Sequence, residues 1–169
     1  MDTTQPITVV TQFITDDGTD SGTLSEIKRL FVQNGKVIEH PMSNLGGNKE
    51  YNSLSDEMCA AHKKVFGDTN DFKVKGGMAQ MSKALDAGMV LVMSLWDDHA
   101  ANMLWLDSTY PVDKTSPGGP RGDCATTSGV PDQVEAQHPN AYVEYGNVRI
   151  GEIGSTYKDL VTGEMEKAL

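Results

Sequence analysis

The chain has 169 residues, which is enough for one domain or for part of a larger one. Its formal net charge of -10 argues against binding to a nucleic-acid backbone. The longest apolar run, Met89–Met93, is far shorter than a membrane span, so we expect a soluble protein with no membrane partner. The 17 glycines and 7 prolines divide the sequence into short periodic segments, which favours an all-β sandwich over a helical bundle.

The first third of the chain predicts strands. Ile7–Thr15 is rich in Thr, Val, Ile and Phe and is apolar on both alternating faces, which predicts a strand buried inside a sandwich. Ile27–Gln33 and Lys36–Ile38 flank Asn34-Gly35, a strong hairpin signal. Met42–Asn52 is expected to be a loop.

Two short helices are predicted next. The first has Ser53 as its N-cap and Gly67 as its stop signal, and the second ends at Gly88. Their apolar residues recur at helical spacing and are Leu54, Met58, Ala61 and Val65 in the first helix and Met78, Met81 and Leu85 in the second. We expect both helices to cover the sandwich.

The second half of the chain again predicts strands joined by loops. Met89–Trp96 has apolar residues on both faces and is expected to be a central strand. Ser108–Gly129 is a loop whose path is set by prolines, and Ala141–Ile150 alternates as a last strand. Lys158–Leu169 is polar and is expected to be a loose tail or a short helix.

Trp96 and Trp105 are the most informative residues, because they lie among Asp and Tyr residues. A flat indole packs against the C–H face of a pyranose, while nearby polar side chains bind the sugar hydroxyls. The alternative is that both tryptophans are core residues, and the residues alone leave the two interpretations open.

The sequence predicts no metal, no cofactor and no catalytic group. Asp97-Asp98-His99 with Asp107 suggests a metal site, but adjacent ligands at a strand end point in opposite directions. A retaining glycosidase needs two carboxylates about 5–5.5 Å apart, and no Glu-x-Asp-x-x-Glu cluster occurs. Ser94 and His99 lie in no nucleophile-elbow context.

The segments Gly88–Asp98 and Ala101–Pro111 resemble glycoside hydrolase family seven, which comprises fungal and protist cellobiohydrolases and endoglucanases. The similarity extends through nearly the whole chain. Further matching segments are Thr8–Phe13, Val32–Gly35, Gly76–Met81, Arg121–Cys124, Ser128–Pro131, Pro139–Val143 and Ile153–Thr156.

The resemblance implies a concanavalin A-like jelly-roll β-sandwich, present here in part, whose concave face holds a cellulose chain. It implies that residues 1–157 are the C-terminal part of the catalytic domain, followed by the polar tail 158–169. The family's two catalytic glutamates lie upstream, so we expect Met1 to be internal to the parent protein and the isolated chain to be inactive. The parent is expected to be a secreted monomer that binds cellulose and cello-oligosaccharides. The alternative is a non-catalytic jelly-roll sugar-binding protein.

The resemblance also implies substrate contacts for five residues. Trp96 is similar to the family's stacking tryptophan on the glycone side of the cleavage point, and Trp105 to the one on the leaving-group side. Tyr110 and Arg121 match product-site residues, and Asp97 borders the same groove. The Ala101–Thr109 stretch is more similar to cellobiohydrolases, but His99-Ala100 replaces two tyrosines of some members, which leaves exo or endo action open.

The residues alone leave the state of the two cysteines open. The resemblance implies that each bonds to a partner in the upstream part of the domain. We therefore predict that Cys59, on the first helix, and Cys124, in the loop after Arg121, are not bonded to each other.

Overall fold

The computed structural model describes residues 1–44 and 49–161, which form two compact units. The first, called here the sheet unit, comprises Met1–Met89 and Arg149–Leu169. The second, called the loop unit, is Val90–Val148. Among the described residues, no helix has the length and apolar character that crossing a bilayer would require.

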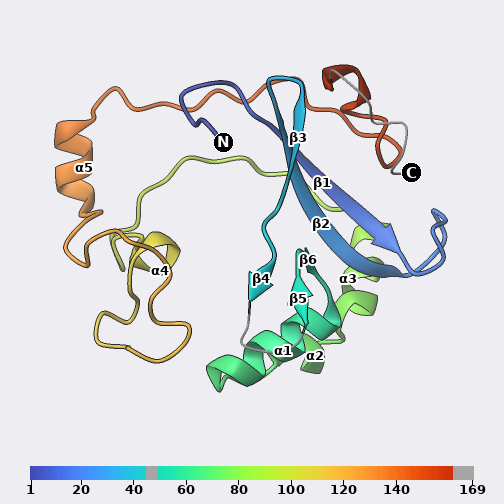
Figure 1. The fold of residues 1–169 in the computed structure, drawn as a ribbon, viewed down its shortest axis with the longest axis horizontal. Helices are drawn as coiled ribbons and strands as arrows, with labels where there is room; N and C mark the ends of the chain where they lie inside the picture. Colours follow the sequence, from blue (N-terminus) through green and yellow to red (C-terminus); the bar gives the residue numbers. More distant parts are fainter. Residues whose placement is uncertain (45–48, 162–169) are drawn as a thin grey trace. The chain divides into compact units, whose positions relative to one another are not determined.

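The sheet unit is built on an antiparallel sheet (Figure 1). Strands β1 (Thr8–Thr15), β2 (Leu24–Gln33) and β3 (Lys36–Glu39) are hydrogen-bonded in that order, and β6 (Ser53–Leu54) pairs with β2. The two strands expected from Ile7–Thr15 and Ile27–Gln33 are thereby confirmed.

The predicted hairpin turn is also confirmed. Asn34 has a φ of 51° and Gly35 a φ of 75°, so both turn residues are left-handed, the conformation in which Asn-Gly matches the twist of the flanking strands. Val32 consequently pairs with Val37, and Gln33 with Lys36.

The predicted loop Met42–Asn52 is only partly a loop. Strands β4 (Ser43–Asn44) and β5 (Glu50–Tyr51) pair within it as a small antiparallel ribbon. Residues 45–48 of this segment lie outside the described residues.

One face of the sheet carries the hydrophobic core of this unit. Val10, Leu30 and Val32 pack with Tyr157, and Val37, Leu160 and Val161 lie partly buried against them. On the other face, Val9 is 58% exposed and Phe13 is 49% exposed. The expectation that β1 is buried on both faces is therefore wrong in this structure, because only one of its faces is covered.

Helices α1 (Asp56–Phe66), α2 (Asp71–Val74) and α3 (Gly77–Asp86) follow the sheet. The two predicted helices correspond to α1 and α3, and α2 was not predicted. Gly67 ends α1 with a φ of 68°, as predicted from the stop signal. Helix α3 packs beside β2, where the Leu24 backbone N–H donates to the Ser82 hydroxyl (3.1 Å).

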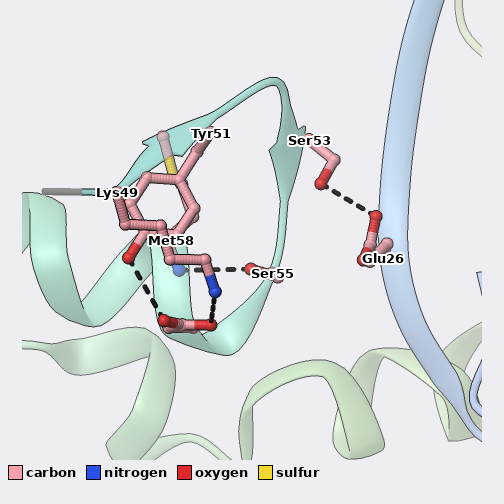
Figure 2. A network of polar contacts seen from close by, with 7 residues as sticks. Glu26, Lys49, Tyr51, Ser53, Ser55 and Met58 are labelled. Carbon is pink, nitrogen blue, oxygen red and sulfur yellow. Dashed lines mark hydrogen bonds and ion pairs between the residues drawn. The ribbon is translucent and has the colours of Figure 1, made fainter. Parts of the chain in front are cut away.

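The predicted N-cap of α1 was wrong by two residues. The Ser55 hydroxyl accepts from the Met58 backbone N–H (3.1 Å), whereas Ser53 lies in β6 and donates to the Glu26 carboxylate (2.9 Å; Figure 2). Either serine can cap a helix, and the pairing of β6 with β2 decides between them because it holds Leu54, the residue that would begin a helix capped by Ser53, in a strand.

Lys49 and Tyr51 also point toward α1 (Figure 2). Lys49 forms an ion pair with Glu57, and the Tyr51 hydroxyl donates to the same carboxylate (3.4 Å). The hydrogen bond from Lys49 is the main reason that the pKa of Glu57 is lowered. These groups are exposed, so the network orients β5 and adds little stability.

The loop unit contains two short helices that were not predicted, α4 (Leu104–Asp107) and α5 (Pro131–Gln137). Much of Ser108–Gly129 is loop, as expected, with one bridge between Thr109 and Pro120.

The strands predicted at Met89–Trp96 and Ala141–Ile150 are wrong. Both segments lack strand structure, and apolar side chains such as Val90 (87% exposed) and Ile150 (96% exposed) lie in solvent. An apolar segment becomes a strand only where a neighbouring strand satisfies its backbone groups, and the described residues provide no such partner here. The Tyr145 hydroxyl does join the two segments by donating to the Ser94 carbonyl (2.9 Å).

The predicted tail begins with a short 3-10 helix, η1 (Lys158–Leu160). Asp159 in this turn accepts from Arg149 (2.7 Å). Residues 162–169 of the predicted tail lie outside the described residues.

Candidate functional site

Two of the predicted sugar-binding residues meet in the loop unit. The rings of Trp96 and Trp105 are stacked, with centroids 5.9 Å apart and an interplanar angle of 29°. Trp96 is 57% exposed, and Trp105 is partly buried. Neither indole is buried among aliphatic side chains, so both remain candidates for stacking on a sugar.

Asp98 fixes the orientation of Trp105, and the sequence did not single it out for this role. Its carboxylate accepts from the Trp105 indole N–H (2.8 Å) and from the backbone N–H groups of Ala100 (2.8 Å) and Ala101 (3.1 Å). The bond from Trp105, followed by that from Ala100, lowers the pKa of Asp98. Aspartate is a common turn residue, but the sequence alone does not show that the Trp105 indole reaches this carboxylate.

Arg121 lies against the backbone of Trp105. Its Nη1 donates to the Trp105 carbonyl (2.9 Å) and its Nε to the Gly118 carbonyl (3.0 Å). These bonds use two of the five guanidinium donors and hold the side chain at an exposed position. The structure therefore brings Arg121 to the backbone of Trp105, 16 residues away in the sequence.

Tyr110 and Asp97 form no hydrogen bond or ring contact with the stacked indoles in the part of the chain that the structure describes. The Tyr110 backbone N–H donates to Gly119 (3.1 Å), next to the Thr109–Pro120 bridge, and its side chain is 37% exposed. Among the described residues, the ring of Tyr110 makes no stacking contact with either indole. Asp97 directs a carboxylate oxygen to within 3.8 Å of the His99 ring.

The spacing of the indoles limits how a sugar can bind. A pyranose between two rings needs van der Waals contact of roughly 3.5–4.0 Å on each side, or about 7–8 Å in total. The observed 5.9 Å is shorter, so in this arrangement only the outer faces of the pair are available.

The cysteines lie where the sequence predicted. Cys59 is on α1 and Cys124 is in the loop after Arg121, and both are free thiols in this structure. The Cys124 backbone N–H donates to the Asp107 carbonyl (3.0 Å), and the fully buried Ser108 hydroxyl donates to the Cys124 carbonyl (2.6 Å). The nearby charge of Asp107 is the main cause that raises the pKa of the Cys124 thiol.

This geometry predicts slow alkylation of Cys124, because the thiolate is the reactive form. Replacing Asp107 by Asn removes the repelling charge, lowers the thiol pKa and is expected to speed iodoacetamide labelling of Cys124 a few-fold at pH 8. Peptide mass spectrometry measures the rate at each cysteine. Asp113→Asn, at another exposed loop position, is the control and should leave the rate unchanged. Equal rates in the two variants would contradict the electrostatic cause.

Comparison with known proteins gives a consistent result. The sequence profile of glycosyl hydrolase family 7 matches residues 1–157. A family 7 cellobiohydrolase from Daphnia pulex is 56% identical, with a TM-score of 0.79 over 83% of this chain and 32% of its own. A Melanocarpus albomyces cellobiohydrolase solved with cellotetraose is 44% identical, with a TM-score of 0.68 over 80% of this chain and 30% of its own.

The Humicola insolens endocellulase EGI is 36% identical, with a TM-score of 0.63 over 80% of this chain and 29% of its own. The chain therefore spans about a third of the length of these solved cellulases. The predicted fold class, part of an all-β jelly-roll sandwich, is confirmed by these similarities. Since the family profile covers nearly the whole sequence, the chain belongs to glycosyl hydrolase family 7.

Proposed function

We propose that this chain is the substrate-binding, C-terminal part of a cellulase catalytic domain. The whole enzyme hydrolyses β-1,4-glucosidic bonds of cellulose with retention, as a secreted monomer. The observation that supports binding most directly is the exposed indole of Trp96, which is stacked on Trp105, whose backbone carbonyl accepts from Arg121. The higher identity to the two cellobiohydrolases than to the endocellulase favours release of cellobiose from chain ends.

Each side chain has a role that its chemistry supports. The outer face of Trp96 packs on the C–H face of a glucose ring, and Arg121 offers a planar fork of donors to vicinal hydroxyls. The Asp97 carboxylate accepts from a hydroxyl, and the exposed Tyr110 borders the leaving sugar. We infer that the indoles separate when a cello-oligosaccharide binds, because both then serve as platforms on either side of the cleavage point.

Bond cleavage itself is assigned to residues outside this chain. Retention needs one carboxylate as nucleophile and a second carboxylic acid to protonate the leaving oxygen. The sequence contains no Glu-x-Asp-x-x-Glu cluster that would supply the pair.

The same observation favours a second candidate, a non-catalytic carbohydrate-binding protein that keeps the stacking residues. The coding sequence upstream of Met1 separates the two candidates. A continuous reading frame that encodes Glu-x-Asp-x-x-Glu supports the cellulase, and a promoter directly before Met1 supports the binding protein.

Binding of cellotetraose tests the proposal directly. We expect titration to saturate and to change the near-ultraviolet circular dichroism of the stacked indoles as they separate. Trp96→Ala removes the exposed platform and is expected to weaken binding about tenfold or more, because it removes most of the apolar contact area.

Tyr142→Ala is the matched control, since Tyr142 is an aromatic residue of the same unit with 79% exposure. Its affinity should equal that of the unmodified chain. Maltotetraose, with α-linked glucose, is the ligand control. Equal losses in the two variants, or no binding of cellotetraose at millimolar concentration, would contradict the proposed site.

A further inference from the structure

A second cluster of side chains lies in the loop unit, outside the tryptophan pair. It consists of Asp97, His99 and Glu135, and one ligand atom from each lies within 4.8 Å of the other two. His99 Nε2 is 3.8 Å from Asp97 Oδ1 and 3.7 Å from Glu135 Oε1. Two carboxylate oxygens and one imidazole nitrogen thus converge from two separate segments of the chain.

The local turn explains how Asp97 and His99 can face the same point. The carboxylate of Asp98, between them, is directed to the Trp105 indole and to the backbone of Ala100 and Ala101. The Asn102 backbone N–H also donates to the Asp98 carbonyl (2.9 Å). In an extended strand Asp97 and Asp98 would diverge, and here the turn leaves Asp97 and His99 together, two residues apart.

Helix α5 brings the third ligand from a distant part of the sequence. Gly129, just before α5, has a φ of 75°, and a Cβ at this position would be 2.1 Å from the Asn102 carbonyl oxygen. The start of α5 is therefore packed against the turn that follows His99. Glu135 lies on this helix, and its carboxylate reaches the His99 ring.

The donor set suits a divalent transition metal. One imidazole with two carboxylates is a combination that binds Zn²⁺, Mn²⁺ or Fe²⁺. Metal–ligand bonds of about 2.0–2.2 Å place neighbouring ligand atoms roughly 3.0–3.5 Å apart. The His99 nitrogen is 3.7 and 3.8 Å from the two carboxylate oxygens, so these distances need to shorten only slightly. The exposed side chains of His99 and Glu135 can make this adjustment. The net charge of -10 adds a general attraction for cations.

We propose that Asp97, His99 and Glu135 form a binding site for a divalent metal ion that clips α5 to the segment carrying Trp96. The ion has three protein ligands and completes its coordination with water, so the site is a structural clip with an open position. The alternative is an ion pair only, in which His99 contacts the two carboxylates without any metal. The proposal shares the Asp97 carboxylate with the proposed sugar site, so the variants that test it are placed at His99 and Glu135, which have no proposed sugar contact.

Zinc titration of the full 169-residue chain tests the proposal, with Zn²⁺ and then Co²⁺ as the probes. Imidazole NMR signals follow each of the four histidines separately. We expect the His99 signals to respond first, saturating near one equivalent, and Co²⁺ to give absorption bands of a histidine-ligated ion. Isothermal titration gives the affinity.

Glu135→Gln is expected to weaken Zn²⁺ binding at least tenfold, because it removes one anionic ligand and leaves a poor one. Glu144→Gln is the matched control, an identical change at another exposed glutamate of the same unit, and it should retain the affinity of the unmodified chain. His99→Gln should abolish the high-affinity step, whereas His138→Gln should not. These side chains are exposed, so their replacement leaves the buried residues of the fold untouched.

Two results would overturn the proposal. One is a His99 signal that responds to Zn²⁺ no earlier than His138. The other is a zinc affinity that none of the variants alters, which would leave these three side chains as an ion pair only.

Discussion

The isolated 169-residue chain is expected to release no measurable product from cellulose or from an aryl cellobioside. Retaining hydrolysis requires an acid to protonate the leaving oxygen and a carboxylate to form the glycosyl-enzyme intermediate. The sequence has no Glu-x-Asp-x-x-Glu cluster, and the residues proposed to bind sugars around the tryptophan pair do not supply these two carboxyl groups. Removing a catalytic group lowers the rate by several orders of magnitude. We therefore expect hydrolysis by this chain to fall below the detection limit of the assay.

Fluorescence of released aryl alcohol and reducing-sugar assays measure this activity. A cellobiohydrolase of the same family, assayed at equal molarity, is the positive control. Cellotetraose titration of the same sample shows whether the sugar site is formed, which separates a missing catalytic pair from a chain that fails to bind. Turnover above the buffer rate from the purified chain would contradict the prediction.

Local signals in the sequence predicted the sheet unit well. Asn34-Gly35 specifies a two-residue turn through its own backbone preferences, and Gly67 ends α1 for the same reason. The strand Thr8–Thr15 follows from its β-branched residues. These features depend on residues within a few positions of one another, so a sequence contains all that is needed to place them.

The failed predictions depend on partners that a local pattern does not reveal. Met89–Trp96 and Ala141–Ile150 have the composition of strands, but a strand is stable only when another strand pairs with it. Val9 and Phe13 are apolar, but which face of β1 is covered depends on distant residues. The choice of Ser55 over Ser53 as N-cap depends likewise on the pairing of β6 with β2.

The candidate site shows the same division. The tryptophans could be singled out because an indole among polar residues has a recognisable chemistry. The role of Asp98 and the approach of Glu135 to His99 could not, because both arise from the turn at Asn102 and from where α5 begins. Contacts that depend on the path of one tight turn can therefore be assigned only when the backbone structure is known.

That turn makes Gly129 the position where a small substitution is expected to have a large structural effect. Gly129→Ala adds a methyl group in left-handed backbone and places it 2.1 Å from the Asn102 carbonyl oxygen, a backbone atom that cannot rotate away. Left-handed conformation costs about 1–2 kcal/mol and forced overpacking about 1–3 kcal/mol, so we expect the loop unit to lose roughly 2–5 kcal/mol of stability. Near-ultraviolet circular dichroism of the stacked indoles during urea unfolding measures the loss.

Two control variants separate the collision from the backbone conformation. Gly18→Ala has a φ of 73° and a Cβ that meets nothing within 4 Å, so it carries only the conformational cost, and that cost falls on the sheet unit. Gly146→Ala lies in the loop unit with open space around its Cβ and should leave the indole signal unchanged. Because Asn102 begins the turn that leads into α4, the collision should also displace Trp105 and reduce the indole signal before any denaturant is added. A Gly129→Ala protein with the native indole spectrum and unchanged urea midpoint would show that the approach of this backbone to Asn102 does not hold the turn in place.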